Sequence, residues 1–223
     1  MKGKLFIVPT PVGNLSDMTF RAIEMLKNAD RILCEDTRQS KKLCDHFQIN
    51  TPLSPFHKMN EYKVLDHYIH ELISGKMICL ISDAGTPLIS DPGNLLIDKC
   101  IENEIKIETL PGATAFVPAL VNSGFDLSQF VFLGFPPHKK GRQTFIKNIS
   151  NENRTIVIYE SPYRVVKFLE EYKEWIGDER LLSISREISK KFEETKRGNA
   201  SDLIEHFKKT PPKGEFVVVI ASK

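Results

Sequence analysis

The sequence predicts an α/β protein with a mostly parallel sheet in its N-terminal part and a mixed sheet in its C-terminal part. Short apolar runs rich in β-branched residues alternate with helical patterns over the first 125 residues or so, which is typical of βαβ units. Farther along, strand-like runs follow one another more closely and fewer helical patterns separate them, which favours antiparallel or mixed pairing. A chain of 223 residues is long enough to form both parts.

The N-terminal part contains four successive pairs of a strand and a helix. The predicted strands are residues 4–9, 31–35, 77–82 and 105–111, and the helical patterns that follow them are residues 17–30, 38–47, 92–102 and 114–124. Asp17 is a suitable N-cap for the first helix, because its side chain can accept a hydrogen bond from a backbone N–H of the first turn. Asp91 is a suitable cap for the third helix, with Pro92 in its first turn.

The C-terminal part has five strand-like runs, at residues 129–135, 154–161, 181–188, 191–198 and 214–222, and three helical patterns, at 141–149, 162–175 and 201–209. The turn-forming residues Asn122 to Asp126 suggest a boundary between two lobes, 1–123 and 124–223. We expect a ligand site in a cleft between two such lobes.

The composition is ordinary for a soluble protein, with 41% hydrophobic residues, 27% charged residues and a net charge of +2. No stretch approaches the roughly 18 apolar residues of a membrane span, and the N-terminus lacks a signal-peptide pattern, so we expect a cytoplasmic location and no membrane partner. The four cysteines, Cys34, Cys44, Cys79 and Cys100, are widely spaced in apolar or helical contexts, which predicts buried free thiols rather than disulfides or zinc ligands.

Polar, glycine-rich and proline-rich stretches follow each predicted strand of the N-terminal part. They are "PTPVGNLSD" (9–17), "EDTR" (35–38), "SDAGTPLISDPG" (82–93) and "PGATA" (111–115). Because ligands bind beyond the carboxyl ends of parallel strands, we expect these four stretches to converge at one edge of the sheet.

Three interpretations of these stretches remain open at this point. They could be tight βα turns with ordinary helix caps. Alternatively, Glu35, Asp36, Asp83 and Asp91 could bind Mg²⁺ in a phosphohydrolase, since carboxylates suit hard cations. The third is a small adenosine-containing ligand held mainly by backbone groups, but without the GxGxxG or GxxxxGK[ST] motif, both of which the sequence lacks.

Two basic clusters are candidates for contacts with phosphates. Residues 138–147 include Lys139, Lys140, Arg142 and Lys147 and no acid, whereas the second cluster, Lys190 to Arg197, is interrupted by Glu193 and Glu194. The first is the better candidate, although a solvated helix start would have the same pattern.

Six motifs resemble one known family in order and over nearly the whole chain. They are "VPTPVGNLSDMTFRA", "CEDTRQS", "ISDAGTPLISDPG", "LPGATAFVPAL", "YESPYRV" and "REISKKFEETKRG". The chain resembles the ribosomal RNA small-subunit methyltransferase I family, which belongs to the tetrapyrrole methylase superfamily. A chance match of six motifs in register is very improbable.

This resemblance implies a two-lobed class III methyltransferase fold and a homodimer. It implies S-adenosylmethionine-dependent 2'-O-ribose methylation of a cytidine in the decoding region of small-subunit rRNA, either naked or in an assembled subunit. The N-terminal lobe would hold the substrate and part of the cofactor site, and the C-terminal lobe would complete the cofactor cleft. The alternative within the superfamily is a C-methyltransferase that acts on a small tetrapyrrole.

The resemblance also implies which residues form the site, and no metal is among its components. The cofactor-binding residues would be Pro9, Ser82, Asp83, Ala84, Gly85, Thr86, Pro111, Gly112, Ala113, Thr114, Ala115, Tyr159, Glu160, Ser161 and Pro162. Candidates for a general base at the strand ends are Glu35, Asp36, Asp83, His57 and Glu160. Glu35 and Asp36, next to Arg38, could equally form a structural ion pair. We expect RNA contacts from Arg38, Lys139, Lys140, Arg142 and Arg164, and from a second group formed by Arg186, Lys196 and Arg197.

Two features depart from the family pattern. The chain ends at "GEFVVVIASK", without the additional C-terminal segment of longer members, so RNA contacts made there are expected to come from elsewhere or from a partner subunit. Met59 occupies a position where relatives often have a second histidine, which weakens any mechanism that needs that imidazole.

Overall fold

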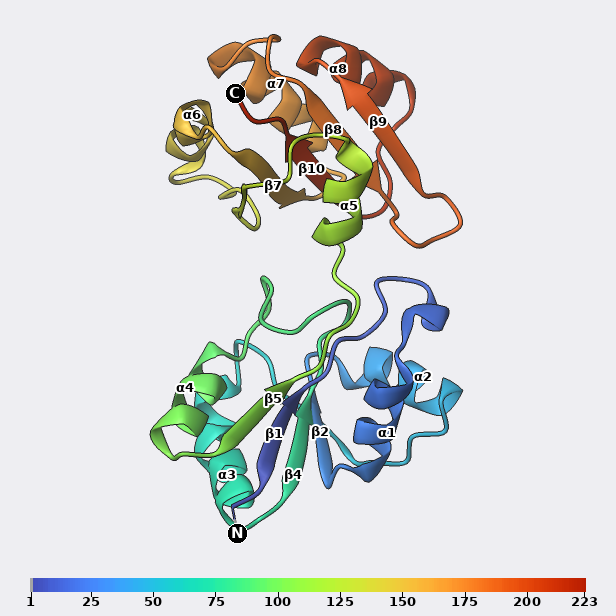
Figure 1. Cartoon of the computed structure of the whole chain (residues 1–223), viewed down its shortest axis with the longest axis vertical. Coiled ribbons are helices and arrows are strands. Elements are labelled where there is room, and N and C mark those ends of the chain that lie inside the picture. Colours follow the sequence, from blue (N-terminus) through green and yellow to red (C-terminus); the bar gives the residue numbers. More distant parts are fainter. Residues whose placement is uncertain (1) are drawn as a thin grey trace. The chain divides into compact units, whose positions relative to one another are not determined.

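The computed structural model describes residues 2–223 and divides into two compact units, Met1–Thr114 and Ala115–Lys223 (Figure 1). The first helix of the second unit, α5 (Phe116–Ser123), packs on the strands of that unit. The structure therefore divides the chain before α5, whereas the turn at 123–126 that the sequence favours as a boundary follows this helix.

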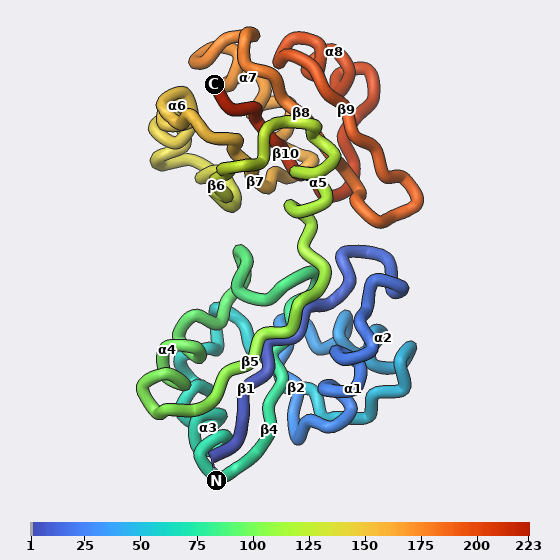
Figure 2. The backbone as a smooth tube through the Cα atoms, viewed as in Figure 1, coloured from blue at the N-terminus to red at the C-terminus, as the bar shows by residue number. Residues whose placement is uncertain are grey.

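The first unit is built on a five-stranded sheet in which every pairing is parallel. Its strand order is β3-β2-β4-β1-β5, formed by β1 (Lys4–Ile7), β2 (Arg31–Cys34), β3 (Leu53–Pro55), β4 (Met77–Leu80) and β5 (Lys106–Thr109). Figure 2 shows β5 running beside β1 before the chain enters the second unit. Because all five strands are parallel, their carboxyl ends lie at the same edge of the sheet.

Two helices cover each face of this sheet (Figure 1). Helices α1 (Phe20–Asn28) and α2 (Thr37–His46) pack on one face, where Leu26 and Cys44 meet Phe6 of β1. Helices α3 (Glu61–Ile73) and α4 (Asn94–Glu102) pack on the other face, where Leu72 and Leu96 meet Leu5 and Ile7 of β1. All four cysteines are free and buried, as the sequence predicts.

Strand β4 is the point at which the sheet connections change sides. The chain leaves β1 and β2, the two neighbours of β4, toward α1 and α2 on one face, whereas it leaves β4 toward α4 on the other. In open α/β sheets the loops beside such a strand diverge and leave a crevice that binds ligands. The stretch that follows β4 is "ISDAGTPLISDPG".

Two of the predicted helix caps are wrong. Asp17 ends a short 3₁₀ helix, η1 (Leu15–Asp17), and Thr19 caps α1 by accepting a hydrogen bond from the N–H of Ala22 at 3.1 Å. Helix α4 begins at Asn94 rather than at Pro92, and its N-cap is Gly93, whose φ of 128° suits glycine. Asp91 therefore remains in the loop.

The second unit contains a mixed five-stranded sheet of order β6-β7-β10-β8-β9. The strands are β6 (Phe130–Phe132), β7 (Thr155–Glu160), β8 (Leu182–Arg186), β9 (Glu194–Gly198) and β10 (Phe216–Ile220), and only β6 and β7 pair in parallel. Helices α6 (Arg142–Asn151), α7 (Val165–Trp175) and α8 (Ala200–Lys209) pack against one face, and α5 covers the other. The predicted fold class, a parallel sheet followed by a mixed one, is confirmed.

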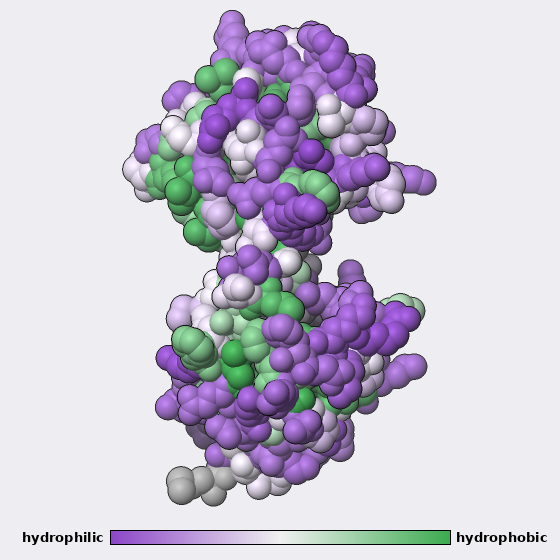
Figure 3. All heavy atoms as spheres, turned by 90° about the vertical axis from the view of Figure 1, so that its right-hand side faces the viewer, coloured by the Kyte–Doolittle hydropathy of each residue, from purple (hydrophilic) through white to green (hydrophobic). Residues whose placement is uncertain are grey.

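The surface of each unit is largely hydrophilic in the view of Figure 3, with smaller areas of apolar side chains. Within residues 2–223, no helix has the length and apolar character that a bilayer crossing requires.

Thr19→Ala is expected to destabilise the protein by about 1 kcal/mol, because the first turn of α1 loses its side-chain cap. Chemical denaturation monitored by circular dichroism measures this difference. Thr19→Ser keeps the hydroxyl and should restore most of the lost stability. If Thr19→Ala were as stable as the parent chain, the side-chain cap would contribute nothing to α1.

Candidate functional site

The loops after β1 and β4 are joined by a pair of backbone hydrogen bonds. The N–H of Thr10 donates to the carbonyl of Gly85 at 2.9 Å, and the N–H of Gly85 donates back to the carbonyl of Thr10 at 2.9 Å. The buried Thr10 hydroxyl also donates to the carbonyl of Ser82 at 3.0 Å. Three hydrogen bonds thus hold the start of the β1 loop against the β4 loop.

The loop after β5 is joined to the same structure. The Thr86 hydroxyl donates to the carbonyl of Ala113 at 3.0 Å and lies 2.6 Å from the Thr114 hydroxyl. Gly112 lies so close to Pro9 that an added Cβ would be 2.6 Å from the Cβ of the proline. Any other residue at position 112 would push the β1 and β5 loops apart.

The β2 loop completes the set. The N–H of Asp36 donates to Oδ1 of Asp83 at 3.3 Å, and the Ser82 hydroxyl donates to the carbonyl of Gly85 at 3.0 Å within the β4 loop. The convergence of four strand-end loops predicted from the sequence is therefore present in the structure, in the sheet order β2-β4-β1-β5.

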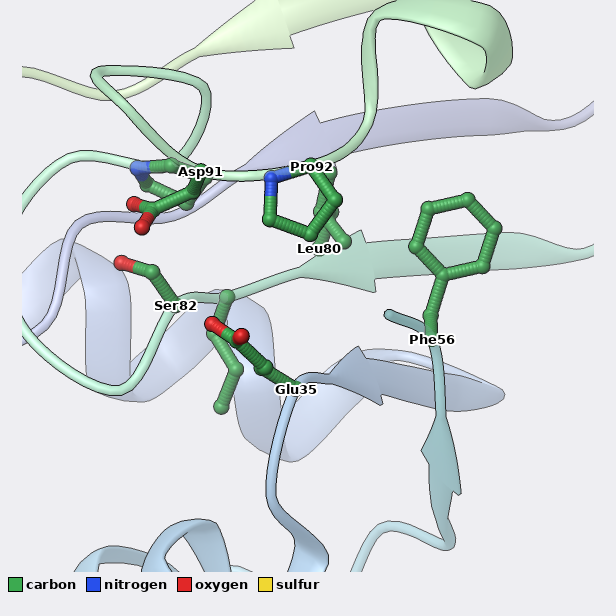
Figure 4. Close-up of a pocket in the computed structure, with 8 residues that line it drawn as sticks. Glu35, Phe56, Leu80, Ser82, Asp91 and Pro92 are labelled. Atoms are coloured by element: carbon green, nitrogen blue, oxygen red, sulfur yellow. The ribbon is translucent and has the colours of Figure 1, made fainter. Parts of the chain in front are cut away.

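A small pocket lies at the carboxyl end of β4 (Figure 4). Its lining residues are Glu35, Phe56, Leu80, Ile81, Ser82, Pro87, Asp91 and Pro92. In Figure 4, the polar ends of Glu35, Ser82 and Asp91 lie on one side of the pocket, and the rings of Phe56 and Pro92 lie on the other. The pocket therefore has one acidic side and one apolar side.

The carboxylates around this pocket differ in their affinity for protons. Burial, together with the negative charges of Glu35 and Asp83, raises the pKa of Asp91 to about 6. Partial burial, with a smaller contribution from the charge of Asp36, also raises the pKa of Asp83. The side chain and backbone N–H of Arg38 donate to Asp36 and lower the pKa of that carboxyl to about 2.

Of the five candidates for a general base, Glu160 lies in the second unit, at the end of β7, and is buried. The other four differ in their surroundings. Glu35 lines the pocket and Asp83 lies in the β4 loop, whereas Asp36 is engaged by Arg38 as the N-cap of α2. His57 lies at the turn before α3, where its backbone N–H donates to the Asn60 side chain at 2.8 Å. In the part of the chain that the structure describes, no group of three or more His, Cys, Asp or Glu side chains is arranged to hold a metal ion.

Sequence reasoning missed Thr10 at this edge, and it included Asp91 only in the magnesium interpretation. Thr10 joins two loops, and its place between two prolines directly after a strand was the available signal. Asp91 was assigned to a helix cap, because an Asp-Pro-Gly run is a common way to begin a helix.

One of the residues predicted for the cofactor in the second unit, Glu160, belongs to a buried ion-pair cluster. Glu160, 1% exposed, accepts from Nε of Arg164 at 2.9 Å and from the backbone N–H of Ser161 at 2.7 Å, and lies 3.4 Å from Nη1 of Arg142. Arg142 also donates through Nε to Glu171 at 2.7 Å. The predicted cofactor contacts of Tyr159 to Pro162 stay predictions. The Glu160 carboxylate already accepts hydrogen bonds from Arg142, Ser161 and Arg164.

Most of the predicted RNA-binding arginines are engaged within the protein. Arg142 is only 5% exposed, so its assignment as an RNA contact does not fit the structure. Arg164 is paired with Glu160, Arg186 with Glu194 at 2.6 Å, and Arg197 donates to the carbonyls of Asn122 and Ser123.

The predicted RNA-binding lysines and Arg38 are more accessible. Lys139 and Lys140 are exposed, Arg38 is exposed although it is paired with Asp36, and Lys196 lies 3.6 Å from Glu194. Their RNA-binding role stays a prediction.

Comparisons with known proteins give the family. The sequence model of the family Tetrapyrrole (Corrin/Porphyrin) Methylases matches residues 4–204. A protein of Synechocystis sp. named ribosomal RNA small subunit methyltransferase I is 44% identical over 98% of this chain and 79% of its own length. A protein of the same name from Thermotoga maritima is 42% identical over 99% of both chains. The chain belongs to the ribosomal RNA small subunit methyltransferase I branch of the tetrapyrrole methylase family.

Solved structures of other tetrapyrrole methylases share the fold. The cobalt precorrin-4 methyltransferase CbiF matches with a TM-score of 0.69 and 15% identity, covering 97% of this chain and 94% of the other. Uroporphyrin-III C-methyltransferase from Thermus thermophilus matches with a TM-score of 0.66 and 18% identity, covering 98% and 94%. The resemblance read from six sequence motifs is confirmed, and this tetrapyrrole methylase is a methyltransferase that uses S-adenosylmethionine.

The residues at the strand ends fit that cofactor. S-adenosylmethionine carries positive charge on its sulfonium and ammonium groups, and Glu35, Asp83 and Asp91 supply negative charge at this edge of the methylase. Its adenine and ribose need hydrogen-bonding groups that a backbone can supply, and the loops at 82–86 and 111–114 present backbone with small side chains. Gly112 permits the close approach of loops that shapes this surface.

Asp91→Asn is expected to stabilise the methylase at neutral and alkaline pH. The pKa of this carboxyl rises from 3.8 to about 6 on folding, so the folded state binds more protons between these values and ionised Asp91 opposes folding above pH 6. The variant should exceed the parent's free energy of unfolding by about 1 kcal/mol near pH 8, after allowance for solvent screening. The difference should vanish below about pH 4.

The matched control is Asp36→Asn, for which the sign is reversed. The pKa of Asp36 falls from 3.8 to about 2 on folding, so its ionised form stabilises the protein at neutral pH and that contribution disappears as the pH falls through this range. Urea denaturation at a series of pH values measures both variants. An Asp91→Asn variant less stable than the parent at pH 8 would contradict the acidic, partly buried setting of Asp91.

Proposed function

We propose that this methyltransferase transfers a methyl group from S-adenosylmethionine to the ribose 2'-oxygen of a cytidine in the decoding region of small-subunit rRNA. The observation that carries the proposal is the sequence identity of 42–44% with proteins named ribosomal RNA small subunit methyltransferase I, over nearly the whole chain. The two tetrapyrrole-modifying enzymes named above, which share the fold, are 18% and 15% identical. Sequence similarity therefore favours the RNA substrate over a tetrapyrrole.

The chemistry asks the protein mainly for positioning. S-adenosylmethionine supplies a methyl group that is already activated by the positive sulfur. The protein has to hold the acceptor oxygen in line with that methyl group, and good orientation of this kind contributes on the order of 7 to 11 kcal/mol. The hydrogen bonds among Thr10, Gly85, Thr86 and Ala113 support such positioning, because they fix three loops on the end of a rigid sheet.

A carboxylate at the strand ends would accept the hydroxyl proton. General-base catalysis of this kind contributes about 10²- to 10⁴-fold. Asp36 is the weakest candidate, because its bonds with Arg38 hold its pKa near 2 and make it a poor base. Glu35 at the pocket and Asp83 in the β4 loop are better placed.

The assembly and location follow from the same proposal. A homodimer is part of it, to be measured by light scattering on a sizing column. So is a cytoplasmic location, where bacterial rRNA is modified. The substrate is either naked rRNA or the assembled small subunit.

The deciding experiment uses labelled S-adenosylmethionine with small ribosomal subunits that lack the modification, with naked small-subunit rRNA, and with a uroporphyrinogen-type tetrapyrrole. Label at a cytidine 2'-oxygen is the expected result. Label on the tetrapyrrole alone, or no transfer despite bound cofactor, would contradict the proposed function.

Thr86→Val is expected to weaken S-adenosylmethionine binding about fivefold, because the isosteric side chain loses the hydroxyl that joins the β4 and β5 loops. Isothermal titration calorimetry measures the change. Thr51→Val is the matched control, since it removes a hydroxyl that donates to the carbonyl of Leu26 at 2.5 Å, at the amino end of β3. Equal cofactor affinity for the two variants would show that the Thr86 bridge does not shape the cofactor site.

A further inference from the structure

In the second unit, a basic loop is fixed against the turn that follows β7. Nη1 of Arg164 lies 2.8 Å from Nδ1 of His138, and Nη1 of the buried Arg142 donates to the carbonyl of Pro137 at 3.3 Å. Lys139 and Tyr163 each lie one residue from the contact between His138 and Arg164. The exposed loop and the turn are therefore held together at this contact, with Lys139 and Tyr163 next to it in the sequence.

The acids beneath this surface are already neutralised. Glu160 pairs with Arg142 and Arg164, and Glu171 pairs with Arg142. Lys139 and Lys140 are exposed and form no ion pair with any residue in the range 2–223. Their positive charge is thus available to a partner, while the buried Arg142 and the half-buried Arg164 hold the loop in place.

Tyr163 adds an aromatic ring to the same surface. Its side chain is 95% exposed, on a turn in which the N–H groups of Arg164 and Val165 both donate to the carbonyl of Ser161 at 3.0 Å. A single exposed aromatic residue is ordinary. Proteins that bind single-stranded nucleic acid combine aromatic rings, on which bases stack, with basic side chains that contact phosphates. Tyr163 and the two unpaired lysines, on segments joined through His138 and Arg164, supply both kinds of group.

We propose that Lys139, Lys140 and Tyr163 form a surface that binds a single-stranded segment of the substrate RNA, with a base stacked on Tyr163 and phosphates at the two lysines. This inference rests on the proposed function and adds the place and manner of RNA contact. A single strand is specified because a paired base inside a duplex does not offer its face to a side chain. Arg142, which the sequence analysis assigned to the RNA contacts, is buried and instead anchors the loop through its hydrogen bond to the carbonyl of Pro137.

The two kinds of contact leave different signatures in binding measurements. The experiment measures the affinity of the purified protein for a fluorescently labelled, unmodified rRNA fragment spanning the decoding region, over a series of salt concentrations. The double variant Lys139→Ala/Lys140→Ala should reduce the slope of log affinity against log salt by about 1.4, which corresponds to two phosphate contacts on a single strand. Tyr163→Ala should weaken binding about 5- to 150-fold at every salt concentration and leave the slope unchanged.

Two further variants serve as controls. Tyr163→Phe keeps the ring and should bind RNA like the parent. Phe20→Ala removes another exposed aromatic ring, which is 93% exposed at the start of α1 in the first unit and lies outside both basic clusters, and should leave RNA affinity unchanged. Circular dichroism and S-adenosylmethionine titration verify that each variant keeps the fold and the cofactor site.

Three outcomes would overturn the inference: parental RNA affinity for Tyr163→Ala, an unchanged salt slope for the lysine variant, or a change in oligomeric mass in place of RNA affinity. Each of these is separable from failure of the proposed function. A parent protein that binds cofactor but methylates no RNA contradicts the proposed function. A parent that methylates RNA, with variants that bind RNA as well as the parent does, contradicts only the role of this surface.

Discussion

The pair of backbone hydrogen bonds between Thr10 and Gly85 is the constraint on which the candidate site depends. Loops at the end of a parallel sheet are otherwise free to diverge, because adjacent connections leave toward opposite faces. This bridge joins the β1 and β4 loops at the point of divergence, and Thr86 and Gly112 extend the connection to the β5 loop. The chain thereby gains a fixed surface made largely of backbone, which suits a ligand with many hydrogen-bonding groups.

Charge is used differently in the two units. At the strand ends of the first unit, partial burial and nearby negative charges raise the pKa values of Asp83 and Asp91, so these carboxyls retain protons more readily than isolated ones do. In the second unit, the buried Glu160 is matched by arginines, and the exposed Lys139 and Lys140 form no ion pair with any of the described residues. The first arrangement favours a ligand with cationic groups, and the second favours a polyanion, as methyl transfer from S-adenosylmethionine to RNA requires.

The sequence predicts much of this fold, and its errors have physical causes. The strand and helix alternation gives the parallel sheet, but β3 has only three residues and includes a proline, so no local pattern reveals it. Asp17 and Asp91 resemble caps because the signal is only a residue type near a helix start. In the structure the Thr19 side chain caps α1, and α4 follows Gly93, whose positive φ favours glycine and which provides no side-chain cap. Arg142 reads as part of a basic surface, but its partners Glu160 and Glu171 are 18 and 29 residues away, which a local pattern does not include.

The most direct test of the central claim is amide hydrogen exchange of the protein with and without saturating S-adenosylmethionine, read by mass spectrometry. If the hydrogen-bonded loops of the first unit hold the cofactor, peptides that cover residues 9–17, 82–93 and 110–115 should exchange more slowly when it is bound. Exchange in peptides from α3 should not change. Cofactor binding that leaves exchange in all three loops unchanged would contradict the account.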